Sequence, residues 1–270
     1  MGYLAPLQGN AFRVGYVMGM PVGIDIRDQW AHDDPSLAGA VIDRCFDELQ
    51  AADEMFSLWR LDTPMARLSS GRATLADMPT EVLEVLRECV LAGRRTGGLF
   101  RARTPDGPVD PTGLVKAWAV ERVGALLSQA SLRHWCVNAA GDVLAHGQAR
   151  PGEGWSVGIV DPRQRERLVD TLVLTVGAVA TSGSAERGEH IWTPSRSASD
   201  RDVRSVSVTA RSIVEADVFA TAAVARGRDA AEWLGDVPGV EGLVVLADGS
   251  LETTSGWPGS AAGVLVDGGR

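Results

Sequence analysis

The chain has 270 residues, of which 45% are hydrophobic and 23% charged, and these are ordinary values for a globular protein with a sizeable core. Its 35 acidic residues outnumber its 26 lysines and arginines and give a formal net charge of −9, which argues against a general nucleic-acid-binding protein. The sequence has no run of about 18 uncharged apolar residues, so we expect no membrane span.

The N-terminal half contains two predicted helices after a strand-like segment. Apolar and small residues alternate over residues 11–28 and predict a strand or a hairpin. Apolar residues at helical spacing predict a helix over residues 36–57, with Ser36 as its expected N-cap. A second helix is predicted over residues 79–98, and Thr80 is expected to cap it.

The C-terminal half is richer in strands. A third predicted helix, residues 113–130, is followed by the strand-like runs HWCVNAAGDVLAHG and WSVGIVDP. Residues 168–183 predict two strands around a turn, and residues 205–212 predict another strand. Residues 215–227 predict a helix, and an Asp248-Gly249 turn predicts a final hairpin. Long helices mixed with many short strands indicate an α+β fold rather than a regular βαβ alternation.

Other features bear on the surroundings of the chain. Residues 187–204 are rich in Ser, Arg and Asp and predict a loop. The cysteines at positions 45, 89 and 136 fit neither a zinc spacing nor a disulfide framework, which favours a reducing compartment. The first residues have no charged-then-apolar targeting signal. We therefore expect a cytoplasmic protein.

The stretch DPTGLVKAWA, residues 110–119, places several functional groups at the start of the third predicted helix. Pro111 and Gly113 favour a turn, after which the free N–H groups of the first helical turn favour an anion. Lys116 lies one turn inside the helix, and Asp110 can bind a cation or accept hydrogen bonds from a ligand. The alternative is an ordinary capped helix with a surface ion pair, and the spacing alone does not separate the two.

Asp217 and Thr221 are spaced four residues apart in the stretch EADVFATAAVA. On a helix they share one face. A carboxylate and a hydroxyl placed in this way offer two hard oxygens, which magnesium accepts when waters and phosphates complete its octahedron. The alternative is a capping Asp with a Thr bonded to its own helix, and an isolated pair favours that alternative.

Several other side chains can contact a ligand, although each has an ordinary explanation. Met18 and Met20 flank a glycine, but methionine is usually a core residue. Trp59 can stack on a ring, but tryptophan too is usually part of a core. Asn138 and Asp142 lie among small residues, which let a ligand approach the backbone but also make ordinary hairpins.

Residues 180–190, ATSGSAERGEH, are dense in polar groups directly after an apolar strand. Thr181, Ser182, Glu186 and His190 are among them, and the plain alternative is a polar loop. A G-x-S-x-G motif is absent from the sequence, so acyl transfer by a serine nucleophile is not expected.

Taken in order, these stretches resemble the ApbE-type FAD:protein FMN transferase family. The resemblance is carried by M-G-M, F-S-x-W-R, D-P-T-G-L-V-K-x-W-A, N-x-x-G-D, A-T-S-G-x-x-E-R-x-x-H-I and A-D-x-x-A-T-A, and it extends from about residue 14 to residue 250. It implies a single compact two-lobed α+β domain over residues 14–255, built of mixed sheets flanked by helices. Residues 1–13 would form an N-terminal extension and residues 256–270 a C-terminal tail.

The resemblance also implies a magnesium-dependent enzyme. Members of this family cleave FAD and pass its FMN half to a Thr or Ser hydroxyl of an acceptor protein, or to water with release of FMN and AMP. Their A-D-x-x-A-T motif holds the metal, which assigns that role to Asp217 and Thr221 together with the backbone carbonyl of Gly113. The implied catalytic residues are Asp217, Lys116 and His190. Implied flavin and nucleotide contacts are Met18, Met20, Trp59, Phe100, Asp110, Lys116, Asp142, Glu186 and His190.

The chain departs from the family's usual pattern at several positions. The usual N-x-G-G-D is Asn-Ala-Ala-Gly-Asp here, so that Ala140 stands where glycine is usual. Residues 192–197 are WTPSRS in place of a segment with Asp and Gly, and Arg101 replaces an Asp. These differences spare the expected metal ligands but alter the expected nucleotide and acceptor surroundings. The alternative function is therefore a non-catalytic protein that holds flavin.

Overall fold

The computed structural model describes residues 11–102, 107–183 and 202–260. Its centre is an eight-stranded sheet in the order β1-β2-β3-β4-β7-β8-β9-β10, and every neighbouring pair is antiparallel. Two further strands, β5 and β6, form a separate antiparallel ribbon. The strands are β1 (Ala11–Val17), β2 (Met20–Ile26), β3 (Trp135–Ala139), β4 (Asp142–His146), β5 (Trp155–Asp161), β6 (Gln164–Leu174), β7 (Val176–Gly183), β8 (Val203–Ala210), β9 (Glu241–Leu246) and β10 (Leu251–Thr253).

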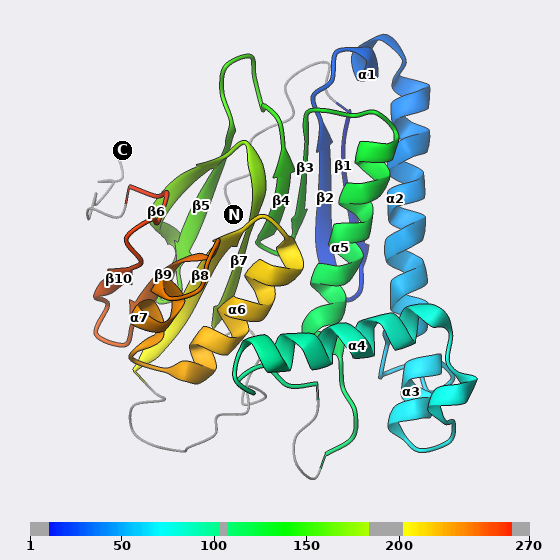
Figure 1. Ribbon diagram of the computed structural model, residues 1–270. Coiled ribbons are helices and arrows are strands. Elements are labelled where there is room, and N and C mark those ends of the chain that lie inside the picture. Colours follow the sequence, from blue (N-terminus) through cyan, green and yellow to red (C-terminus); the bar gives the residue numbers. More distant parts are fainter. Residues whose placement is uncertain (1–10, 103–106, 184–201, 261–270) are drawn as a thin grey trace.

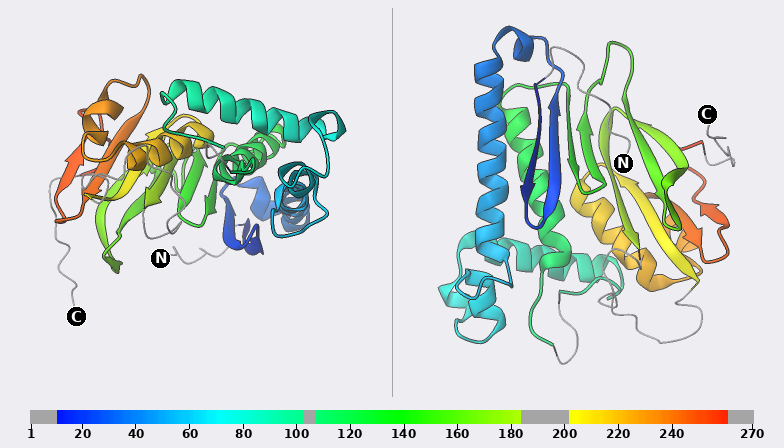
Figure 2. Two further views of the ribbon diagram at one scale, coloured as in Figure 1. Left: turned by 90° about the horizontal axis from the view of Figure 1, so that it is seen from below. Right: turned by 180° about the vertical axis from the view of Figure 1, so that it is seen from behind.

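The long helices lie on one face of the main sheet, and the short α1 and α3 lie beyond its two ends (Figure 1). Three long ones, α2, α5 and α6, pack directly on it, and α4 lies across the outer side of α5 and α6 (Figure 2). The helices are α1 (Trp30–Asp33), α2 (Pro35–Phe56), α3 (Pro64–Ser69), α4 (Thr80–Arg95), α5 (Thr112–Gln129), α6 (Ile213–Arg226) and α7 (Ala230–Gly235), with a short 3₁₀ turn at Leu75–Asp77. None of the described helices is long and apolar enough to cross a membrane.

Two hydrophobic cores lie on opposite faces of the main sheet. The larger core joins the helices to the sheet and includes Leu144 of β4 and Ala180 of β7. The smaller core joins the β5–β6 ribbon to the other face and includes Val143 and Val179, which directly precede Leu144 and Ala180. Successive residues of a strand point to opposite faces, so β4 and β7 contribute to both cores. The fold is therefore α+β, as expected, with all described strand pairs antiparallel.

The predicted helices are confirmed, but two of their starts differ from the sequence-based expectation. Asp34, not Ser36, caps α2, because its Oδ1 accepts a hydrogen bond of 3.0 Å from the backbone N–H of Leu37. Pro35 then occupies the first helical turn, where its missing N–H costs nothing. Thr80 is the first residue of α4 and does not cap it, and Pro79 stands at the cap without a side-chain bond.

The two strands predicted within residues 168–183 are present, but they belong to different sheets and do not form a turn with each other. β6 ends at Leu174 and pairs with β5, whereas β7 begins at Val176 and pairs with β4 and β8. Only one residue separates the two strands, so they have no room to form a hairpin with each other. The expected loop over residues 187–204 lies largely outside the described residues, and β8 already begins at Val203.

Two tight hairpins lie beside each other at one end of the sheet. The β1–β2 turn consists of Met18 and Gly19, with φ of 55° and 73°, and the β3–β4 turn of Ala140 and Gly141, with φ of 53° and 103°. Two consecutive positive φ values in a two-residue loop match the turn that fits the twist of a hairpin. The backbone N–H of Ala140 donates to the carbonyl of Pro21 over 3.1 Å, which joins the two hairpins.

Candidate functional site

Three charged side chains from different elements meet on the helix-covered side of the sheet. Lys116 comes from the first turns of α5, Asp142 from the start of β4 and Asp217 from the middle of α6. The Lys116 ammonium forms an ion pair with the Asp142 carboxylate. Asp142 is only 2% exposed and Asp217 is fully buried, so their charges interact with little screening by water.

Asp142 is held by the sheet as well as by Lys116. Its Oδ1 accepts a hydrogen bond of 3.0 Å from the backbone N–H of Thr181 in β7. Burial raises the pKa of the Asp142 carboxyl to about 6, the Lys116 ammonium opposes that rise, and the negative charge of Asp217 adds to it. The influence of Asp217 means that the two carboxylates share one buried space. With both ionised, they exceed the Lys116 ammonium by one negative charge.

Asp217 and Thr221 face the sheet from α6, one helical turn apart. Asp217 is the fifth residue of the helix, and Ser212 is the N-cap, so the alternative of a capping Asp does not hold. The Thr221 hydroxyl lies 3.0 Å from the hydroxyl of Ser182 in β7, so it bonds across to the sheet. A buried carboxylate and a partly exposed hydroxyl therefore sit on the same helix face, beside Asp142 and β7.

The start of α5 is stabilised by its own side chains. Asp110 Oδ1 accepts hydrogen bonds from the backbone N–H of Thr112, over 2.9 Å, and from the Thr112 hydroxyl, over 2.6 Å. Asp110 thus bonds to the first residue of the helix, whereas Pro111 stands at the N-cap without a side-chain bond, so the side-chain cap expected under the alternative of an ordinary capped helix is absent from α5. The other part of that alternative, a surface ion pair for Lys116, is replaced by the pair with buried Asp142. Gly113 lies three residues before Lys116, on the same side of the first turn.

The remaining predicted site residues are dispersed. Met18 and Met20 are partly buried at the β1–β2 hairpin, at the end of the sheet where β4 begins. Trp59 follows α2 and is 95% exposed, and no contact among the described residues joins it to the charged group. Phe100 is 2% exposed and belongs to the larger core, so its side chain is not open to a ligand. Glu186 and His190 lie outside the described residues.

Two features of the site were missed by sequence reasoning. Asp142 was expected among the flavin and nucleotide contacts, but its burial and its ion pair with Lys116, 26 residues earlier, were not foreseen. Ser182 was noted only as part of a polar stretch, yet it contacts Thr221. The alternation of the strand could have predicted that Ser182 faces the helices. Ala180 and Ser182 share one face of β7, and Ala180 lies in the helix-side core.

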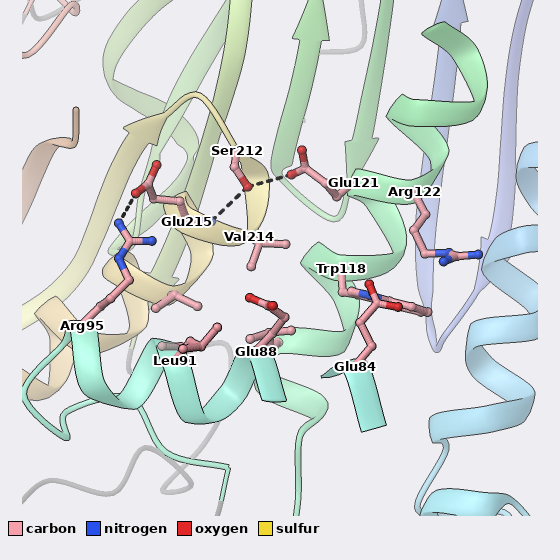
Figure 3. A pocket seen from close by; sticks show the side chains of 13 residues that line it. Glu84, Glu88, Leu91, Arg95, Trp118, Glu121, Arg122, Ser212, Val214 and Glu215 are labelled. Atoms are coloured by element: carbon pink, nitrogen blue, oxygen red, sulfur yellow. Dashed lines mark hydrogen bonds and ion pairs between the residues drawn. The ribbon is translucent and has the colours of Figure 1, made fainter. Parts of the chain in front are cut away.

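A pocket of about 370 Å³ opens on the outer side of α5 and α6, under α4 (Figure 3). Its α6 walls are Val214, Glu215 and Val218, whereas Asp217 and Thr221 do not line it. The pocket and the charged group therefore lie on different faces of α6. Its lining residues are Glu84, Glu88, Leu91, Ala92, Arg95, Leu114, Trp118, Glu121, Arg122, Ser212, Val214, Glu215 and Val218.

Glu121 links this pocket to the start of α6. Its Oε2 accepts hydrogen bonds from the Ser212 hydroxyl, over 2.8 Å, and from the backbone N–H of Ile213, over 2.9 Å. Arg95 forms an ion pair with Glu215 in the same pocket. These contacts fix the N-terminal end of the helix that carries Asp217.

Comparison with known families identifies the chain. The model of the ApbE family matches residues 100–244, just over half of the chain, and this range includes the whole charged group. The chain belongs to the ApbE family. No curated protein sequence matches it significantly.

Solved ApbE structures share its fold. The ApbE protein of Thermotoga maritima aligns with a TM-score of 0.78 at 21% identity, over 91% of this chain and 97% of that one. The flavin transferase ApbE of Vibrio cholerae gives 0.70 at 19% identity, over 91% and 97%. The flavinyl transferase ApbE of Pseudomonas stutzeri gives 0.72 at 18% identity, over 93% and 97%. At these identities the likeness establishes the fold of this ApbE protein.

Proposed function

We propose that this ApbE protein is a magnesium-dependent flavin transferase that takes FAD as donor and a Thr or Ser hydroxyl of an acceptor protein as acceptor. Membership of the ApbE family supports this function, and the similar Vibrio and Pseudomonas proteins are named as flavin transferases. The observation that carries it is the group formed by Lys116 and the buried carboxylates of Asp142 and Asp217 beside Thr221. A pyrophosphate substrate needs both a positive charge and a cation site, and these residues offer the two together.

The residues present fit a hard divalent cation. The described residues contain no cluster of three or more His, Cys, Asp or Glu side chains that would hold a metal. Magnesium does not need such a cluster, because it usually keeps several waters and binds one or two carboxylates together with phosphate oxygens. The Asp217 carboxylate, the Thr221 hydroxyl and the Gly113 carbonyl are all hard oxygen donors. The excess negative charge of the two buried carboxylates also favours a cation.

In this proposal the ammonium of Lys116 provides a positive charge beside the pyrophosphate. An ammonium has three N–H bonds, so it can hold the Asp142 carboxylate and a phosphate oxygen at the same time. Asp142 then acts on the substrate through Lys116, whose ammonium it orients, rather than by touching the flavin. A bound magnesium ion would neutralise the charge of the transferring phosphoryl group.

The transfer itself exchanges one P–O bond for another. The acceptor hydroxyl oxygen attacks the phosphorus of the FMN half, the bond to the bridging oxygen breaks, and AMP leaves with that oxygen. The hydroxyl proton needs a base, for which Asp217 and His190 are the candidates. With water in place of the hydroxyl, the same step hydrolyses FAD to FMN and AMP.

The proposal is tested by incubating the purified protein with FAD and Mg²⁺, with and without a flavoprotein acceptor. We expect AMP release in both cases, faster with the acceptor, and an acceptor mass increased by FMN. EDTA should stop both reactions. A yellow protein whose FAD stays intact under all conditions would favour the alternative of a non-catalytic flavin-binding protein.

A further inference from the structure

Ser182 is a buried hydroxyl to which neither the family resemblance nor the proposed reaction assigns a role. It lies near the end of β7, is 2% exposed, and has its Oγ 3.0 Å from the Oγ1 of Thr221 on α6. Next to it in the strand, Thr181 forms a second hydroxyl pair with Ser207 of β8, over 2.8 Å. Because successive residues of β7 point to opposite faces, only the Ser182 pair faces α6.

The Ser182 contact determines how many lone pairs of the Thr221 hydroxyl remain available to a metal ion. A hydroxyl has one proton and two lone pairs. A threonine inside a helix commonly donates that proton to the carbonyl four residues earlier, which here is the carbonyl of Asp217. The contact with Ser182 offers a partner on the sheet instead, and by its distance of 3.0 Å either hydroxyl can be the donor. A proton donated to Ser182 keeps both lone pairs of Thr221 available to other partners.

We propose that Ser182 is a positioning residue that accepts the Thr221 hydroxyl proton and thereby holds Thr221 Oγ1 as an oxygen ligand for the divalent cation. This inference rests on the metal site of the proposed function, and Ser182 itself does not bind the ion. Residues that orient a metal ligand by hydrogen bonding typically affect metal affinity about 10- to 100-fold. A merely structural link between β7 and α6 would affect folding but not that affinity.

The experiment compares Ser182→Ala with Ser207→Ala as a matched control. Each removes one buried serine hydroxyl from one hydroxyl–hydroxyl bond, but only Ser182 touches Thr221. Binding of Mn²⁺ alone, followed by electron paramagnetic resonance, should be weakened about tenfold by Ser182→Ala and less than about twofold by Ser207→Ala. Melting temperatures in EDTA should fall similarly for both, since each loses one buried hydrogen bond.

Two further variants make the outcome decisive. Thr221→Ala should weaken Mn²⁺ binding as well, and adding Ser182→Ala to it should change the affinity less than about twofold, because the two residues act as one unit. If Ser182→Ala does not fold, Ser182→Cys replaces it; sulfur is a weaker acceptor, so the affinity should still fall.

The failures of this inference and of the proposed function are distinguishable. If Thr221→Ala weakens Mn²⁺ binding but Ser182→Ala matches Ser207→Ala, only the role of Ser182 is overturned. If Thr221→Ala binds Mn²⁺ as tightly as the unmodified protein, the metal site itself is wrong, and the role of Ser182 falls with it.

Discussion

At the scale of single residues, Asp142 has the environment that matters most for the proposed site. It follows a tight turn, and only the folded chain brings it against Lys116 and the backbone N–H of Thr181. Its sequence neighbourhood of small residues gave no sign of burial, because burial depends on elements that lie far away in the chain. The sequence marked Asp142 as a candidate site residue, but it did not predict the partners of Asp142.

The raised pKa of Asp142 predicts a pH dependence of stability. The folded chain keeps the Asp142 proton up to a pKa of about 6, whereas the unfolded chain loses it near the usual value of 3.8. Within this window the folded state binds more protons, so the contribution of Asp142 to the free energy of unfolding falls as the pH rises from about 4 to about 6. Asp142→Asn should remove this component of the pH dependence.

Urea unfolding in EDTA at several pH values between about 4 and about 7 checks this prediction. Asp236→Asn is the control, because Asp236 is an exposed carboxyl at the end of α7. In the control variant, the change in the free energy of unfolding with pH should equal that of the unmodified protein. If Asp142→Asn keeps the pH dependence of the unmodified protein, Asp142 is not the group that causes it.

Ala140 is a second residue whose conformation predicts a measurable effect. Its φ of 53° lies in the left-handed region, where a side chain costs about 1–2 kcal/mol relative to glycine. Ala140→Gly relieves this cost but increases the freedom of the unfolded chain, so the free energy of unfolding should rise by about 0.5–1 kcal/mol. Ala139→Gly, one residue earlier in β3, should instead destabilise. Urea unfolding measures both, and equal losses of stability in the two variants would contradict the prediction.

At the scale of elements, α6 is the helix on which the site depends. It carries Asp217 and Thr221 towards the sheet and is fixed at its start by Glu121 of α5. The helical pattern of residues 215–227 predicted the element, and the spacing of the two residues predicted their common face. The clamp by Glu121 was not predictable, since it joins two helices that are about 90 residues apart in sequence.

Glu121→Ala should therefore destabilise the protein and impair the site. It removes the acceptor of two hydrogen bonds at the start of α6, and we expect a loss of about 1–2 kcal/mol in the free energy of unfolding. Glu88→Ala is the matched control, because Glu88 lines the same pocket and should cost less than about 0.5 kcal/mol. Chemical unfolding of both variants measures the difference. Losses of the same size would mean that Glu121 does not hold α6.

At the scale of the whole molecule, the sequence predicted most elements but not how they pair. The helices were found from apolar periodicity, which is a local property. Strand order is not local, as β2 pairs with β3 through contacts such as Ile26 with Trp135. For the same reason the two strands expected within residues 168–183 were predicted around a turn, although β6 and β7 belong to different sheets. The order of the family motifs supplied the fold that local patterns left open.

The most direct test of the central claim is AMP release from FAD by the Asp217→Asn variant, measured in the presence of Mg²⁺. The substitution keeps the volume of a fully buried side chain and removes its charge, so the fold should persist. We expect the unmodified protein to release AMP, and Asp217→Asn to be slower by at least about 100-fold. Asp236→Asn should release AMP at the unmodified rate. Undiminished release by a folded Asp217→Asn variant would contradict the assignment of this buried group as the site that cleaves FAD.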